Sequence, residues 1–267
     1  MLADVVGALP GGGEARAGQV EMAEAVASTI AGTAPTPHLA VQAGTGTGKT
    51  LAYLVPAVLA GKKTVVATAT KALQDQLAGK DLPFLQERMP EHFEWAVLKG
   101  RANYLCLQRL AELTARAPGG EQLALDGVAE RAPAEELLAL ARWAATTATG
   151  DRAELDVEPS PQAWAAVSVT ARECPGANRC PSGDVCFAEG ARLRAAEADV
   201  VVVNLHLYGL DLAAGGVILP DHEVVIVDEA HQLEEIVSAT AGVDLTGGRF
   251  TDLARRTRGV IEADQLA

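Results

Sequence analysis

Aromatic and basic residues are both scarce in this sequence. Aromatic side chains make up 4% of the 267 residues, so a stacking platform for nucleic-acid bases is not an obvious feature. The formal net charge of −13 argues against a protein that coats nucleic acid through positive charge alone. The charge is uneven, however: residues 1–110 sum to +1, residues 111–170 to −6 and residues 171–267 to −8. A nucleic-acid groove is therefore compatible with the first 110 residues, although their net charge does not establish one.

Long hydrophobic runs are also missing. No stretch approaches the roughly 18 uninterrupted apolar residues of a membrane span. The first 16 residues lack the basic and apolar regions of a secretory signal. We therefore expect a soluble cytoplasmic protein with no membrane partner. In that reducing compartment, the four cysteines indicate metal or thiol chemistry instead of disulfides.

The apolar residues that are present predict an α/β fold. At 49% hydrophobic and 21% charged, the chain can bury a sizeable core and is too apolar for global disorder. Helical spacing predicts a helix over residues 14–32, a second from Lys49 and a third over residues 71–78. Apolar runs predict buried strands at residues 38–42, 64–68, 199–203 and 223–227. This alternation favours a parallel sheet with helices on both faces.

A glycine-rich loop follows the first expected strand. The segment Ala43-Gly-Thr-Gly-Thr-Gly-Lys-Thr50 fits the phosphate-binding loop, with Ala43 in place of its first glycine. Its glycines let backbone N–H groups turn toward phosphate oxygens, and the next helix presents its positive end to the same anion. Lys49 is expected to act on the β- and γ-phosphates, and the Thr50 hydroxyl to bind Mg²⁺. We assign nucleotide binding to Ala43, Gly44, Thr45, Gly46, Thr47, Gly48, Lys49 and Thr50. A glycine-rich turn without a ligand is the alternative, and the expected flanking strand and helix disfavour it.

An acidic motif follows the last expected strand. Residues 224–227 are apolar and run directly into Asp228-Glu-Ala-His231. A buried strand that ends in Asp-Glu is the Walker B arrangement, in which Asp228 holds Mg²⁺ and Glu229 orients and deprotonates the attacking water. His231 lies on the following turn, where it is expected to couple the nucleotide to other sites. The alternative is an ordinary acidic helix N-terminus.

Three of the four cysteines are clustered. Five residues separate Cys174 from Cys180 and Cys180 from Cys186, and Cys106 lies 68 positions before Cys174. Glycine and proline between them keep the chain irregular, which lets several thiolates converge. Four thiolates suit a [4Fe–4S] cluster, and they also suit zinc, whose cysteine pairs usually have about 2–4 intervening residues. Unliganded thiols are the third alternative, and spacing alone leaves all three open.

Other polar residues lie where a ligand could reach them. Arg16 and Gln19 on the first expected helix could read an adenine edge, or they could be solvated helix surface. A second set follows the strands and could contact a nucleic-acid backbone or simply cap helices. That set comprises Thr68, Thr70, Lys71, Gln74, Asn204 and His206.

Together these motifs resemble the XPD/DinG-type iron–sulfur helicases of superfamily 2, most closely the bacterial DinG-like branch. The matching stretches are residues 16–22, 43–50, 65–77, 99–106, the three clustered cysteines, and residues 201–206 and 228–231. They follow the same order along the chain and cover residues 14–240. Lys-Gly-Arg-x-Asn-Tyr-x-Cys followed by three cysteines and a DEAH box is a rare combination.

The resemblance implies a RecA-like motor lobe interrupted by a small, mostly helical iron–sulfur domain. On this basis residues 1–100 and 191–240 form the lobe, residues 101–190 form the cluster domain with an acidic helical insertion, and residues 241–267 begin an arch-like segment. The resemblance also implies that Arg16 and Gln19 contact adenine. It favours a [4Fe–4S] cluster over zinc, with the ligands Cys106, Cys174, Cys180 and Cys186.

The activity implied by the resemblance is ATP-dependent 5′→3′ translocation on single-stranded DNA, with separation of forked duplexes, in DNA repair. We expect a monomer that uses ATP, Mg²⁺ and the cluster. Asn204-Leu-His206 has one residue more than the Asn-His of many relatives, which leaves the role of His206 open. Relatives continue with a second motor lobe that supplies arginines across the nucleotide, and we expect it to be missing here, so this chain should bind Mg-ATP and hydrolyse it weakly. The alternatives are a nucleotide- and cluster-binding module or subunit, and an RNA or protein remodeller.

Overall fold

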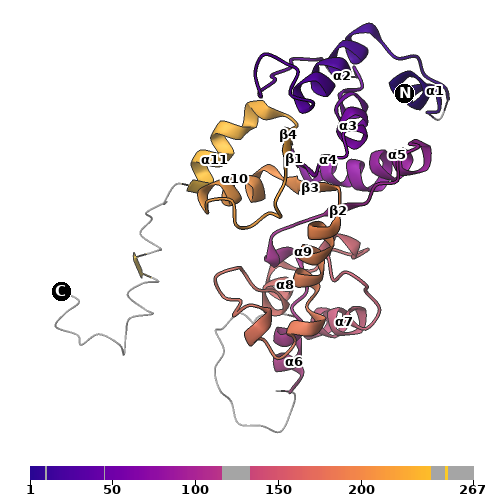
Figure 1. The fold of residues 1–267 in the computed structure, drawn as a ribbon. Coiled ribbons are helices and arrows are strands. Elements are labelled where there is room, and N and C mark those ends of the chain that lie inside the picture. Colours follow the sequence, from indigo (N-terminus) through magenta and orange to yellow (C-terminus); the bar gives the residue numbers. More distant parts are fainter. Residues whose placement is uncertain (10, 45, 116–132, 242–249, 252–267) are drawn as a thin grey trace.

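The computed structural model describes residues 1–9, 11–44, 46–115, 133–241 and 250–251. Figure 1 shows two bodies, an α/β lobe around the sheet and a helical body that contains α6, α7 and α8. The expected arch-like segment lies almost wholly outside the described residues, and so does the 116–132 part of the acidic insertion. No helix in the described ranges is long and apolar enough to cross a membrane.

The lobe is organised by a parallel sheet of four strands. These are β1 (Thr64–Thr68), β2 (Trp95–Val97), β3 (Val200–Asn204) and β4 (Val224–Val227), in the order β2-β3-β1-β4. Every pairing is parallel, and β1 and β3 at the centre are almost completely buried. A strand covered on both faces needs a continuous apolar run, which explains why Thr64-Val-Val-Ala-Thr and Val200-Val-Val-Val form the centre. The predicted α/β fold is confirmed.

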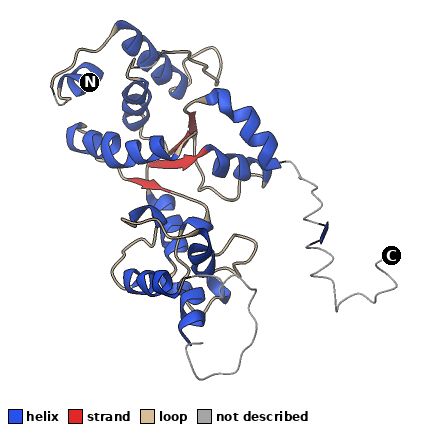
Figure 2. Ribbon diagram, turned by 180° about the vertical axis from the view of Figure 1, so that it is seen from behind, coloured by secondary structure: helices blue, strands red, loops and turns tan. Residues whose placement is uncertain are grey.

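Helices cover both faces of the sheet (Figure 2). Val66, Val200 and Val202 point to one face, where α1 (Leu2–Gly7), α2 (Ala17–Ile30), α3 (Lys49–Leu59) and α5 (Leu82–Arg88) form a core with them. Val65, Val201 and Val203 point to the other face, toward α9 (Phe187–Glu197), α10 (Leu205–Ala213) and α11 (Leu233–Ala241). Alternate residues of a strand face opposite sides, so each valine run supplies both cores. α4 (Lys71–Gln76) follows β1 and continues through a π-helical segment, Leu77–Asp81, into α5.

The helical body is inserted between β2 and β3. Its helices are α6 (Leu107–Ala115), α7 (Ala134–Ala144) and α8 (Pro161–Val167). They pack around a hydrophobic core that contains Leu105, Leu140, Trp164 and Val167. The Trp164 indole donates a hydrogen bond to the Ala102 carbonyl at 2.7 Å, which ties α8 to the segment that leaves the lobe. The chain returns to the sheet through α9. This arrangement agrees with an interrupted lobe, while the exact domain boundaries stay a prediction.

One strand prediction is wrong. Residues 38–42 were expected to form a buried strand before the phosphate loop, but they are extended, unpaired coil in the structure, and Leu39 and Val41 are each 43% exposed. A strand needs a neighbouring backbone to satisfy its N–H and C=O groups, and within the described residues no strand lies beside this segment. An apolar run indicates that burial is favourable but does not supply a partner. The phosphate loop therefore follows exposed coil here.

Candidate nucleotide-binding site

The two charged residues on which the sequence interpretation depends are adjacent. Lys49 is the first residue of α3, and Glu229 follows β4; Lys49 Nζ lies 3.4 Å from Glu229 Oε1. Their side chains are 28% and 33% exposed, so the pair is partly open to solvent. Lys49 Nζ also lies 3.5 Å from the Ala43 carbonyl at the start of the loop. The phosphate-loop lysine and the acidic motif thus form one site.

The turn of the loop depends on glycine. Gly46 and Gly48 have φ angles of 77° and 78°, in the left-handed region that side chains disfavour. A Cβ at Gly48 would lie 2.3 Å from the Gln19 side-chain nitrogen. Gly48 is the N-cap of α3 and provides no side-chain cap, so the first N–H groups of that helix are available to bind an anion. Thr47 closes the turn through a 2.9 Å hydrogen bond from its hydroxyl to the Gly44 carbonyl, and Thr45 lies outside the described residues.

Arg16, the N-cap of α2, and Gln19 of α2 both hydrogen-bond to this loop. Arg16 Nη1 donates to the Gly46 carbonyl at 2.6 Å, and Gln19 Nε2 donates to the Gly48 carbonyl at 3.0 Å. Gln19 is only 6% exposed, so it is not solvated helix surface. A cavity of about 440 Å³ lies beside these contacts, between α2 and residues 40–43. The two residues therefore reach the site, although their observed partners are loop carbonyls.

Both carboxylate oxygens of Asp228 are engaged. Oδ1 accepts from the Glu229 N–H at 3.0 Å, and Oδ2 accepts from the Tyr53 hydroxyl at 3.2 Å. The Asp228 N–H donates to the Ala67 carbonyl at 2.9 Å, which ties the motif to the end of β1. Burial and the charge of Asp228 raise the pKa of Tyr53 well above its usual value, while a hydrogen bond from Thr50 opposes the rise. Tyr53 is consequently a neutral donor at physiological pH.

Glu229 has an uncommon backbone conformation. Its φ and ψ are 57° and 44°, and no other non-glycine residue in the described ranges has a positive φ. Such strain costs about 1–3 kcal/mol and persists where the surroundings determine it, often at functional sites. The turn directs one carboxylate oxygen to Lys49 and brings the other within 3.5 Å of His231 Nδ1. The His231 side chain is 70% exposed, on the open side of the site.

The polar residues after the other strands mainly cap helices. Asn204 Oδ1 accepts from the Leu207 N–H at 2.7 Å at the start of α10. Thr70 Oγ1 accepts from the Leu73 N–H at 3.2 Å at the start of α4. Lys71 and His206 are exposed, whereas Gln74 is buried and its side-chain nitrogen has no described hydrogen-bond partner. Capping thus accounts for Asn204 and Thr70.

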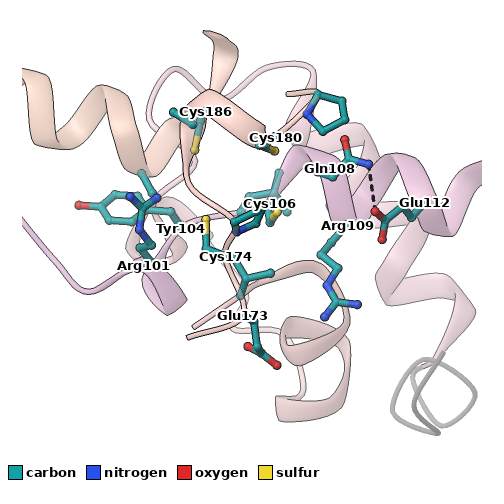
Figure 3. A pocket seen from close by; sticks show the side chains of 16 residues that line it. Arg101, Tyr104, Cys106, Gln108, Arg109, Glu112, Glu173, Cys174, Cys180 and Cys186 are labelled. Atoms are coloured by element: carbon teal, nitrogen blue, oxygen red, sulfur yellow. Dashed lines mark hydrogen bonds between the residues drawn. The ribbon is translucent and has the colours of Figure 1, made fainter. Parts of the chain in front are cut away.

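The four cysteines line one cavity, of about 420 Å³, in the inserted body. Figure 3 shows Cys106, Cys174, Cys180 and Cys186 around the same space. Cys186 is the N-cap of α9, and the Cys106 carbonyl accepts the first helical bond of α6, from Leu110 N–H, at 3.0 Å. Burial raises the pKa of the Cys106 thiol, backbone N–H groups of Arg109 and Gln108 lower it, and the nearby Cys180 and Cys186 raise it. Cys106 is thus brought to the same cavity as the three clustered cysteines, which follow it by 68 or more positions.

Charged residues surround this cavity. Arg101 lines it and pairs with Glu189 of α9 at 3.0 Å. Lys99 Nζ pairs with Asp151 at 2.6 Å, and these side chains are 10% and 18% exposed. The Lys99 N–H donates to the Tyr104 hydroxyl at 3.1 Å, and Tyr104 forms an antiparallel bridge with Asp151. Burial raises the pKa of Tyr104 to about 12, so its hydroxyl stays protonated. These contacts join the segment before Cys106 to the inserted body.

Comparison with known proteins identifies relatives. Residues 22–103 match the family described as DEAD/DEAH box helicase. The chain is 42% identical over 274 aligned residues to the ATP-dependent helicase DinG of Mycobacterium tuberculosis (strain H37Rv), which covers 98% of this chain and 40% of that protein. It is 40% identical to the ATP-dependent DNA helicase YoaA of Escherichia coli K12, over 89% of this chain and 36% of that protein.

This chain is related to the N-terminal portion of the DinG and YoaA helicases. The predicted resemblance to the DinG-like branch is thereby confirmed. The DinG-related chain spans about 40% of the length of the first of these relatives. The DEAD/DEAH match ends at residue 103, the last residue of the turn Arg101–Asn103 that leads into the inserted body.

Sequence reasoning missed several residues of the DinG-related chain that the structure places in or near its sites. Tyr53 contacts Asp228, and the only available signal was its position three residues after Thr50, on the same helical face. The Lys99–Asp151 and Arg101–Glu189 pairs join residues 52 and 88 positions apart, respectively. No local pattern indicates such pairs.

Proposed function

We propose that this chain is the ATP-binding part of an ATP-dependent DNA helicase of the DinG and YoaA type. The observation that carries the proposal is the 3.4 Å separation of Lys49 Nζ and Glu229 Oε1, which puts the phosphate loop and the acidic motif at one site. The names of the relatives, which describe ATP-dependent DNA helicases, support the reaction and the nucleic acid.

The residues of the site divide the chemistry of ATP hydrolysis between them. When ATP binds, Lys49 leaves Glu229 and contacts the β- and γ-phosphates. The N–H groups of the loop and of the start of α3 bind the phosphate oxygens. Glu229, released from Lys49, orients the attacking water and accepts its proton. Gln19 of α2 lines the cavity that would take the adenine, and Arg16, the N-cap of α2, hydrogen-bonds to the adjacent loop.

Thr50 and Asp228 would hold Mg²⁺ with the nucleotide. A hydroxyl and a carboxylate are the oxygen ligands that Mg²⁺ prefers. The Tyr53 hydroxyl, on the same face of α3 as Thr50, donates to Asp228 Oδ2, which supports the convergence of the two side chains on one position. When bound, the ion would neutralise phosphate charge.

The four cysteines would ligate a [4Fe–4S] cluster. Cys106, Cys174, Cys180 and Cys186 line one cavity, and two of them stand at the N-termini of α6 and α9. The resemblance of the cysteine-bearing segments to those of iron–sulfur helicases favours the cluster over zinc.

Single-stranded DNA, entering from a forked duplex, is the proposed substrate, with 5′→3′ translocation by a monomer. The exposed Lys71, beside the Thr70 cap at the start of α4, is a candidate contact to its backbone. The second candidate function is a module that binds nucleotide and cluster without unwinding DNA. It is favoured by the nucleotide-facing residues, which all come from one lobe.

The test is nucleotide binding followed by DNA-stimulated hydrolysis. A fluorescent ATP analogue should bind the purified chain more tightly with Mg²⁺ than in EDTA. Single-stranded DNA should raise the slow ATP hydrolysis of the chain if the helicase proposal holds. Mg-ATP binding without any response to DNA would support the module, and no binding of ATP at all would refute both.

A further inference from the structure

Tyr53 is a buried tyrosine on the helix that follows the phosphate loop. It is 3% exposed and packs in the core beneath the sheet with residues of α3, α5 and β1. It lies three positions after Thr50, so the two side chains share one face of α3. Phenylalanine or leucine would fill the same volume, and burial alone therefore does not account for the hydroxyl.

The hydroxyl is directed at the acidic motif. It donates to Asp228 Oδ2 at 3.2 Å, while Asp228 Oδ1 accepts from the Glu229 N–H at 3.0 Å. Thr50 opposes the rise in the pKa of Tyr53, so its side chain lies near the phenol. The phenol oxygen connects α3 to a carboxylate that lies 175 positions away in the sequence. A carboxylate held at both oxygens cannot rotate freely.

We propose that Tyr53 is a positioning residue for the Mg²⁺ site, which orients the Asp228 carboxylate before Mg-ATP arrives. This inference rests on the proposed function, since it assumes that Asp228 binds the ion. Ligands that are already oriented lose less conformational freedom when the metal binds, so hydrogen bonds behind the ligands raise metal affinity. Tyr53 acts through Asp228.

Tyr53→Phe removes the hydroxyl and keeps the buried ring. The matched control is Tyr208→Phe, a partly buried tyrosine of α10. For each protein, a fluorescent ATP analogue is titrated in EDTA and at increasing Mg²⁺, which gives the metal-free affinity and the Mg²⁺ concentration at half-maximal enhancement. Mn²⁺ binding to the nucleotide complex, followed by electron paramagnetic resonance, measures the same site without hydrolysis.

Tyr53→Phe should raise the half-maximal Mg²⁺ concentration about ten- to hundredfold, the usual weight of one hydrogen bond to a charged group, and leave the metal-free affinity unchanged. Tyr208→Phe should change neither value. In an Asp228→Asn background the effect of Tyr53→Phe should largely disappear, because the pair acts as a unit.

An unchanged Mg²⁺ midpoint in Tyr53→Phe would overturn the inference, and so would an equal effect in the Asp228→Asn background. Loss of metal-free binding together with a lower melting temperature would assign Tyr53 a merely structural role and would also overturn it. If the unaltered chain binds ATP but ignores Mg²⁺, the proposed function itself fails. The two failures are therefore distinguishable.

Discussion

Lys49 and Glu229 are separated by 180 positions in the sequence, yet Lys49 Nζ lies 3.4 Å from Glu229 Oε1. The contact arises because Lys49 opens the helix after the phosphate loop and Glu229 follows β4 at the carboxyl edge of the sheet. The Glu229 carboxylate lies beside the lysine at a position where a phosphate oxygen would compete with it. Phosphate binding must then exchange one partner of Lys49 for another.

Glu229→Gln is expected to separate binding from hydrolysis. The substitution removes the charge that competes with phosphate for Lys49, so affinity for ATP should stay equal or increase. Loss of the general base should lower the rate of hydrolysis about 10²–10⁴-fold. Single-turnover hydrolysis with radiolabelled ATP, beside an equilibrium titration, measures both. Weaker binding with unchanged hydrolysis would contradict the assigned role.

Gly48→Ala should impair nucleotide binding more than its backbone strain alone predicts. The added Cβ would require a left-handed alanine and would also displace Gln19, whose nitrogen lies 2.3 Å away. Gly61→Ala is the matched control, because its φ of 61° imposes similar strain and nothing lies within 4 Å. Both should lower the free energy of unfolding by about 1 kcal/mol in urea titrations, and only Gly48→Ala should reduce ATP affinity. Equal ATP affinities would argue against the Gln19 contact.

Asp151→Asn should lower the free energy of unfolding of the chain. It leaves Lys99, whose side chain is 10% exposed, without its charged partner, and breaking such a pair costs about 3–5 kcal/mol. Glu158→Gln is the control, since Glu158 pairs with Arg152 but its side chain is 76% exposed, and it should cost less than about 1 kcal/mol. Urea denaturation measures both. Similar costs for the two variants would mean that the Lys99 pair does not join the two bodies.

The cysteine assignment predicts metal content. Chain purified without oxygen should contain about four iron atoms and absorb in the visible range as [4Fe–4S] proteins do. Serine at Cys106, Cys174, Cys180 or Cys186 should lower the iron content, whereas Ser182→Ala, beside Cys180, should not. One zinc per chain, or iron content unaffected by the serine variants, would contradict the cluster.

Much of the lobe could be predicted from local sequence. Strands β1, β3 and β4 are covered on both faces or nearly so, which demands apolar runs that a sequence displays directly. The phosphate loop and Asp228 follow patterns whose residue types the chemistry prescribes. β2 was missed because it has only three residues, Trp95–Val97, which is too short for a clear apolar run.

Other features depend on tertiary contacts that no local pattern encodes. Residues 38–42 have the composition of a strand, but pairing is a property of two segments, and the described residues supply no neighbour. Gln19 could equally have been surface, and only the fold buries it against Gly48. Tyr53 resembles any core aromatic until β4 brings Asp228 beside it.

The central claim is that Lys49 and Glu229 flank one triphosphate, and equilibrium binding of a fluorescent ATP analogue to Lys49→Ala tests it most directly. Lys80→Ala, an exposed lysine of the π-helical segment, is the control. We predict that Lys49→Ala weakens ATP binding at least about tenfold, the equivalent of one charge-assisted contact, while Lys80→Ala binds as the unaltered chain does. Unchanged affinity in Lys49→Ala would contradict the account.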